Sequence, residues 1–169
     1  MERSQGPTAI VLSRQKLPVL DRTVLPPASG TRHGGYILWE TAKKPDVIVI
    51  GTGSEVHIAL EAAKLLQEKG VKARIVSMPS WELFDAQPVE YRNEVLPPDI
   101  WRRISIEAGT TLGWERYVGQ EGITIGLSRF GASAPGKTIY EKFGLTAQCV
   151  VDATLTLLQR RSRARPLIH

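Results

Sequence analysis

The sequence is poor in cysteine and histidine and contains no long hydrophobic run. Its single cysteine, Cys149, excludes an internal disulfide and a cysteine-rich metal site. No apolar run approaches the roughly 20 residues that a membrane-spanning helix needs, and the opening residues MERSQGPTA lack the apolar stretch of a secretory signal. We therefore expect a cytoplasmic protein in a reducing compartment, with no membrane partner.

Positive charge is concentrated at one end of the chain. The net charge at pH 7 is +5, and arginines at positions 160, 161, 163 and 165 crowd the last residues. Without these arginines the net charge would be +1, so the body of the protein is nearly neutral. The aromatic residues and glycines that accompany basic residues in single-strand-binding segments are absent from this stretch. We expect residues 160–169 to form a solvated basic tail, and we expect no nucleic-acid partner.

The three histidines show no spacing typical of a metal site or of a Ser-His-Asp set. His57 is expected on the outer side of a helix, His33 lies in a glycine-rich loop, and His169 is the last residue. Glu107 ends a predicted strand and is a candidate acid or base, although a satisfied polar contact is the favoured interpretation. The aromatic pair in GWERYVG (113–119) is expected to pack a helix or a partner surface.

A strand, a helix and a second strand are predicted in the first half of the chain. Residues 46–50 (DVIVI) form a β-branched run, typical of a strand covered on both faces. The helix that follows should begin with a capping box of Thr52 and Glu55 and end before Gly70. Its apolar residues fall on one stripe, namely Val56, Ala59, Leu60, Ala63 and Leu66. With a strand at 73–76, this segment forms a βαβ unit with parallel strands.

The rest of the chain continues the alternation. Further strands are predicted at 36–39, 103–107 and 123–127. Further helices are predicted at 88–96, from a cap at Ser133 to Phe143, and from a cap at Thr146 along the stripe Ala147, Val150, Val151, Thr154 and Leu158. The pattern indicates an α/β sandwich with helices on both faces of a mostly parallel sheet.

An apolar run at 8–12 (TAIVL) is also typical of a buried strand. The loop-like segment 25–35 (LPPASGTRHGG) separates it from the sheet, in which it has no place. We therefore expect this strand to belong elsewhere. On the residues alone, Arg14 just after it is best explained by a salt bridge at the strand end.

The turn GTGSE (51–55) is the segment most typical of a binding site. Backbone N–H groups at a helix start attract anions, and glycines allow a phosphate to approach closely. However, Val56 stands where a dinucleotide-binding fingerprint has its third glycine, and no Gly-Lys-Ser/Thr ending of a P-loop follows. A tight turn before a capped helix is the favoured interpretation. An anion site at Gly51, Thr52, Gly53 and Ser54 is the alternative.

Eight short segments occur along the chain in a characteristic order and spacing. They are LSRQ (12–15), GGYIL (34–38), IGTGSEV (50–56), VKARIVSMPSWELFDAQ (71–87), YRNEVLP (91–97), EAG (107–109), RYVG (116–119) and FGASAPGKTIYEKFGLT (130–146). Together they resemble the C-terminal part of transketolases. The resemblance implies a three-layer α/β/α sandwich with a mostly parallel, mixed sheet of about five strands, the first of them (36–39) antiparallel to the rest.

In transketolases three α/β domains follow one another, binding the cofactor diphosphate, binding its pyrimidine, and closing the chain. LSRQ lies at the end of the pyrimidine-binding domain in this family. The resemblance therefore implies that residues 1–33 are a flexible tail of that domain plus a linker, and that residues 34–159 are the C-terminal domain. It also implies that Arg14 contacts the substrate phosphate, a role that suits a guanidinium.

The resemblance also defines what this sequence lacks. The family holds thiamine diphosphate and Mg²⁺ or Ca²⁺ through a Gly-Asp-Gly motif, which is absent from these residues. We therefore expect the chain to bind no cofactor or metal and to be inactive alone. Its implied partners are the N-terminal transketolase domains, in a complete homodimeric enzyme that moves a two-carbon ketol unit between sugar phosphates of the pentose phosphate pathway. The chain would then be a fragment or one product of a divided gene, with a structural or regulatory role.

Two alternatives remain open at this point. One is the terminal domain of a related thiamine enzyme, either deoxyxylulose-phosphate synthase or the β subunit of a 2-oxoacid dehydrogenase, although LSRQ, VSMPS and FGASAP favour transketolase. The other is a stand-alone module that binds a phosphate or nucleotide at the GTGSE turn.

Overall fold

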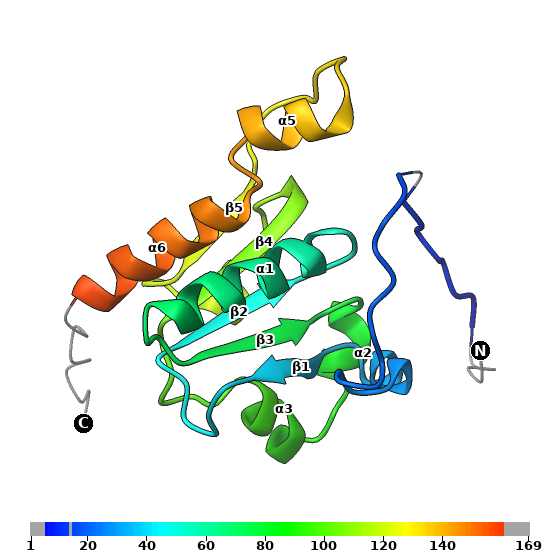
Figure 1. The fold of residues 1–169 in the computed structure, drawn as a ribbon. Coiled ribbons are helices and arrows are strands. Elements are labelled where there is room, and N and C mark those ends of the chain that lie inside the picture. Colours follow the sequence, from blue (N-terminus) through cyan, green and yellow to red (C-terminus); the bar gives the residue numbers. More distant parts are fainter. Residues whose placement is uncertain (1–5, 14, 161–169) are drawn as a thin grey trace.

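The structure is a computed structural model that describes residues 6–13 and 15–160. Its strands form one mixed sheet in the order β1-β3-β2-β4-β5 (Figure 1). They are β1 (Tyr36–Glu40), β2 (Val47–Gly51), β3 (Ala73–Ser77), β4 (Arg103–Thr110) and β5 (Ile123–Leu127). Strands β2 to β5 pair in parallel, whereas β1 pairs antiparallel with β3. The predicted five-stranded mixed sheet is confirmed.

Helices cover both faces of the sheet and give three layers (Figure 1). On one face lie α1 (Glu55–Glu68) and α6 (Ala147–Gln159), and on the other α2 (Trp81–Asp85), α3 (Val89–Val95) and α4 (Glu115–Val118). The short helix α5 (Gly136–Lys142) stands away from the sheet, and a 3-10 helix, η1 (Ala28–His33), precedes β1. Within residues 6–13 and 15–160, every helix is too short or too polar to cross a membrane.

Strand β2 lies at the centre of the sheet, and all of its residues are buried. Val47 and Val49 belong to the core under α1 and α6, whereas Ile48 and Ile50 belong to the core under α2, α3 and α4. Successive side chains of a strand point to opposite faces, so an unbroken apolar run is needed where both faces are covered. The interpretation of DVIVI as such a strand is confirmed.

The helix ends agree only in part with the sequence pattern. Thr146 caps α6, as predicted, because its side chain accepts a hydrogen bond from the backbone N–H three residues later. The predicted cap at Ser133 is wrong, because the backbone is still extended at the proline before Gly136, where α5 begins. On α6, Leu157 is fully buried, whereas Leu158, placed on the buried stripe by the sequence pattern, is only half-buried.

The described residues before η1 (6–13 and 15–27), here called the N-terminal strap, run beside the sheet rather than in it (Figure 1). The strand predicted at 8–12 is not formed in this structure, and Ile10, Val11 and Leu12 are exposed. A strand needs a neighbour that satisfies its backbone N–H and C=O groups. Among the described residues no strand pairs with this run.

Candidate functional site

The carboxyl ends of four parallel strands lie at one edge of the sheet, which is where open α/β sheets usually place ligands. At this edge residues 51–54 join β2 to α1. A Cβ added to Gly51 would lie 3.1 Å from the Cα of Val56, so a side chain there would crowd the helix. Gly53 has a φ of +55°, in the left-handed region that favours glycine. The turn is therefore tight, and it sets Glu55 at the first position of α1.

The buried carboxylate of Glu55 is the centre of a polar network. Only 3% of this residue is exposed. Its Oε1 accepts hydrogen bonds from the hydroxyls of Ser54 and Tyr140, each at 2.6 Å. The Nε2 of Gln15 donates in turn to the Tyr140 oxygen at 3.4 Å. These residues, Gln15, Ser54, Glu55 and Tyr140, are called the Glu55 cluster below.

The Glu55 cluster joins three segments that are far apart in the sequence. Gln15 lies in LSRQ, Ser54 and Glu55 in GTGSE, and Tyr140 on α5 in FGASAPGKTIYEKFGLT. Burial is the main cause that raises the pKa of Tyr140, and the hydrogen bond to Glu55 raises it further. Tyr140 therefore remains a protonated donor at neutral pH. The negative side chain also lies in the first turn of α1, where the helix dipole favours it.

The predicted capping box between Thr52 and Glu55 is wrong. No side chain caps α1, and the backbone N–H of Glu55 donates to the carbonyl of Thr52 at 3.1 Å. The Glu55 side chain instead meets Tyr140, which lies 85 positions later. Sequence reasoning missed this network because no local pattern encodes a partner so distant. The one local signal was an acidic residue in the first turn of a helix.

The structure places the residues of the predicted anion site in this turn. Gly51 is buried, Gly53 is exposed with open space beside it, and the Ser54 hydroxyl donates to Glu55. The adjacent buried carboxylate of Glu55 disfavours a second negative group at this turn. Binding of an anion here stays a prediction. Arg14, the predicted contact of a substrate phosphate, lies outside the described residues.

A second polar contact lies on the other face of the sheet. The indole N–H of Trp114 donates to Oε2 of Glu107 at 2.8 Å, which confirms that Glu107 makes a polar contact. Trp114 and Tyr117 are buried, and both pack against Trp81. The aromatic pair thus packs α4 against α2, as predicted. The hydroxyl of Tyr117 donates to Asp85, and burial together with this negative charge raises the pKa of Tyr117.

The residues present do not fit thiamine diphosphate and its metal ion. Within the described ranges, no group of three or more His, Cys, Asp or Glu could hold a metal ion. The glycine-rich turn carries the buried Glu55 carboxylate, which opposes a diphosphate. His57 is half-buried on α1 with its pKa lowered by burial, His33 packs 5.0 Å from the Tyr91 ring, and His169 lies outside the described residues.

Comparison with known proteins identifies similar sequences and folds. Residues 34–146 match the family model described as the Transketolase-like TK C-terminal domain. The chain is 46% identical over 155 residues to a transketolase of Aquifex aeolicus, covering 92% of this chain and 22% of that protein. It is 50% identical over 149 residues to a chloroplastic transketolase of Zea mays, covering 87% of this chain and 22% of that protein.

Solved structures agree with the sequence comparison. A transketolase from Leishmania mexicana superposes with a TM-score of 0.72 and 42% identity, over 78% of this chain and 19% of that chain. The chain spans less than a third of the length of the curated relatives it matches, from 22% to 30% in the first three.

Proposed function

Because the chain belongs to the transketolase family through its C-terminal domain, we propose that it supports transketolase catalysis as that domain and does not carry the chemistry itself. The match of residues 34–146 to the family domain is the observation that carries this proposal. The complete enzyme would transfer a two-carbon ketol unit between sugar phosphates. Its thiamine diphosphate and Mg²⁺ or Ca²⁺ would be held by domains outside these residues, since the residues described here do not fit them.

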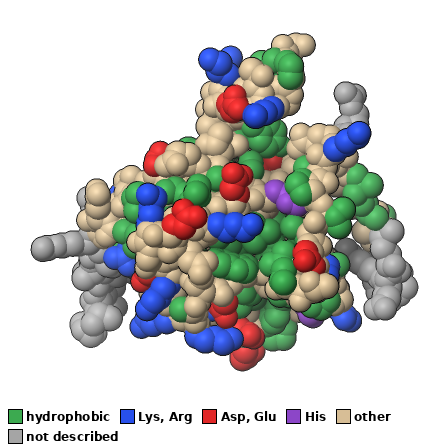
Figure 2. All heavy atoms as spheres, in the orientation of Figure 1, with side chains coloured by type: hydrophobic (Ala, Val, Ile, Leu, Met, Phe, Trp, Pro, Cys, Tyr) green, Lys and Arg blue, Asp and Glu red, His purple; other side chains and the backbone are tan. Residues whose placement is uncertain are grey.

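The N-terminal strap supports the need for further domains. Val11 is 95% exposed and Val19 is 96% exposed, although both are strong strand formers. Figure 2 shows hydrophobic side chains of this strap at the right of the molecule, in contact with solvent. We attribute residues 1–33 to the end of the pyrimidine-binding domain, where the run at 8–12 would pair with strands of that domain.

Three finer assignments belong to the same proposal. In the complete enzyme Arg14 would contact the phosphate of the substrate, because a guanidinium binds phosphate oxygens in pairs. The complete enzyme would act as a homodimer. The single cysteine fits a reducing compartment such as the cytoplasm.

A reconstitution assay tests the proposal. The chain is mixed with the separately expressed first two domains of the Aquifex aeolicus transketolase, together with thiamine diphosphate, Mg²⁺, a ketose phosphate and an aldose phosphate. We expect no turnover from either part alone, and turnover or a stable complex on mixing. Turnover by this chain alone, or no association at any protein ratio, would contradict the proposal.

A substitution on the strap separates docking from folding. Val11→Asp should leave the melting temperature of the isolated chain unchanged, because the side chain it replaces is 95% exposed, and should weaken association with the other domains. Val89→Asp is the matched control, since Val89 is 51% exposed and lies at the start of α3, outside the strap. Equal loss of association in both variants would argue against docking through the strap.

A further inference from the structure

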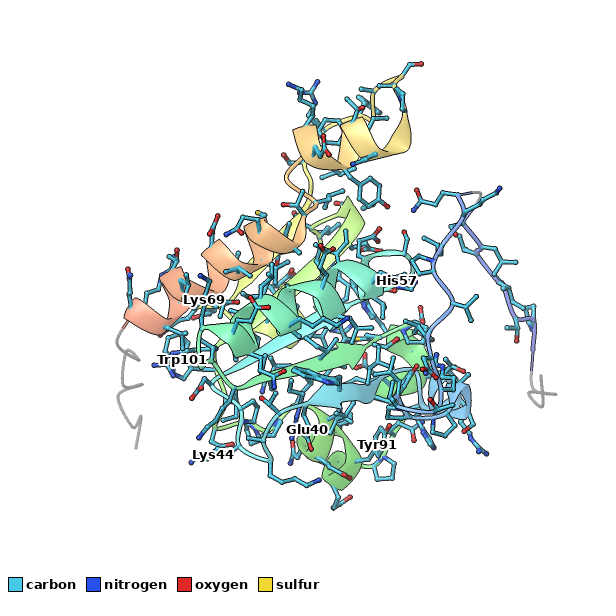
Figure 3. All side chains as sticks on the ribbon, viewed as in Figure 1. Glu40, Lys44, His57, Lys69, Tyr91 and Trp101 are labelled. Carbon is cyan, nitrogen blue, oxygen red and sulfur yellow. The ribbon has the colours of Figure 1, made fainter. Side chains whose placement is uncertain are left out.

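The amino-terminal ends of the parallel strands carry a polar pocket, at the edge of the sheet opposite the Glu55 cluster. The cavity has a volume of about 330 Å³, and its lining includes Lys44, Asp46, Lys72, Asp99, Trp101 and Arg102. Three connections supply these residues, between β1 and β2, between α1 and β3, and between α3 and β4. Lys44 and Trp101 mark this edge at the lower left of Figure 3, whereas His57 lies at the other end of α1.

The walls of this pocket are held by their own hydrogen bonds. The Asp46 carboxylate accepts from the Lys72 backbone N–H at 2.9 Å, and the Asp46 backbone N–H donates to the Lys72 carbonyl at 2.7 Å. On the other side, Arg103 donates to three carbonyls of residues 96–100 at 2.7 to 3.1 Å. Walls that are already ordered lose little conformational freedom when a ligand binds.

Several hydrogen-bond donors at the pocket are available to a ligand. Within residues 6–13 and 15–160, the Lys72 ammonium has no ion-pair partner and the Trp101 indole N–H donates to no other residue. The Arg102 guanidinium lies 4.6 Å from the Trp101 ring centroid and uses its Nε on a backbone carbonyl of α6. Lys44 approaches Asp99 only to 3.8 Å, with side chains 83% and 64% exposed. Such exposed pairs are weak and exchange readily for a ligand.

These groups define the chemistry of a ligand. Three cations against two carboxylates leave a net positive charge, which suits a phosphate group. The carboxylates of Asp46 and Asp99 can accept hydrogen bonds from hydroxyl groups. The volume is near the lower limit of about 300 Å³ for small-molecule sites, which favours a small ligand over a nucleotide.

We propose that this pocket binds a small sugar monophosphate, with its phosphate on Lys44, Lys72 and Arg102 and its hydroxyls on Asp46 and Asp99. The inference holds whether or not the proposed function is correct. A bound sugar phosphate would stabilise this domain.

Titration of the full 169-residue chain tests this site, with amide NMR signals as the readout. Ribose 5-phosphate should shift the signals of residues 44, 46, 72 and 99–102. Ribose and inorganic phosphate, at the same ionic strength, should each bind at least about tenfold more weakly, because each satisfies only half of the polar groups. The proposal fails if these signals do not move, if inorganic phosphate binds as well as ribose 5-phosphate, or if adenosine monophosphate binds more tightly.

Two lysine variants localise the binding. Lys72→Ala should weaken the binding of ribose 5-phosphate by about tenfold or more, the usual effect of losing one charge-assisted hydrogen bond. Lys69→Ala is the matched control, because Lys69 is also exposed and follows α1 but does not line the cavity (Figure 3). Equal weakening in both variants would mean general charge attraction and would overturn the assignment.

Discussion

Replacing Tyr140 by phenylalanine should release α5 from the body of the domain without unfolding it. None of the residues of α5 is buried, so its position depends on few contacts. The hydrogen bond from the Tyr140 hydroxyl to Glu55 is one of these contacts, and it is short and made to a carboxylate that is only 3% exposed. Tyr140→Phe removes this bond and keeps the ring.

The size of the effect follows from the partners. A hydrogen bond to a charged group contributes about 1.5–3 kcal/mol, and the Ser54 hydroxyl still donates to Glu55 after the change. The loss should therefore stay near the lower end of that range. Because 1.4 kcal/mol is a factor of ten in an equilibrium constant, local opening of α5 should become roughly 10-fold more frequent. The free energy of global unfolding should change less, because no residue of α5 is buried and Tyr140→Phe keeps the ring that packs against the core under α1 and α6.

Amide hydrogen exchange across residues 136–142 measures this opening, with urea unfolding as the global readout. Tyr91→Phe is the matched control, because its hydroxyl also donates a single hydrogen bond, to the carbonyl of Gly35 on another part of the domain. A double-mutant cycle with Glu55→Gln should give a coupling free energy of about 1–2 kcal/mol. Unchanged exchange in Tyr140→Phe, or a coupling near zero, would refute the reasoning.

Three further predictions concern stability. Ser105→Ala should leave the free energy of unfolding unchanged or raise it by up to about 1 kcal/mol in urea titrations, because the hydroxyl is fully buried and has no described partner; a loss above about 1 kcal/mol would contradict this. Burial raises the pKa of Tyr117 and Tyr140 above 10.0, so their contribution to the free energy of unfolding should be complete below pH 10.0 and be lost as the pH rises through the raised pKa values. In urea unfolding at increasing pH, Tyr117→Phe should therefore lose less stability than the unsubstituted chain. Thr146→Ala should cost about 1 kcal/mol in urea unfolding through the lost cap of α6, whereas Thr156→Ala, at an exposed position of the same helix, should cost less than about 0.5 kcal/mol.

The sheet was predictable because its signals are local and repeated. Residues 46–50 and 123–127 are apolar enough to mark strands on their own, and the stripe on α1 has regular helical spacing. The helices that escaped prediction, η1, α2 and α4, are too short to show a period. The run at 8–12 forms no strand in this structure, for a different reason. Its composition favours a strand, but pairing requires a neighbour that the described chain does not supply.

The candidate site was less predictable than the fold. GTGSE was recognised as a tight turn, and the turn is confirmed. The hydroxyl that donates to Glu55 beside this turn belongs to Tyr140, which lies 85 positions later in the sequence. A side-chain contact of this kind depends on the packing of the whole domain, and single-sequence patterns carry no information on it. The sequence pattern therefore predicted that Glu55 caps its own helix, whereas its side chain contacts a residue that is distant in the sequence.

The two edges of the sheet differ in a way that bears on how the domain works. The carboxyl edge, which in open α/β sheets usually receives a ligand, is occupied here by contacts of the chain with itself, since Glu55 is satisfied by Ser54 and Tyr140. At the amino-terminal edge, by contrast, the Lys72 ammonium has no ion-pair partner among the described residues and lies beside a cavity. A domain that had to perform chemistry at its carboxyl edge would leave polar groups open there. The internal hydrogen bonds at the carboxyl edge agree with the proposal that the chemistry lies in other domains, and the proposed sugar monophosphate would bind at the opposite edge.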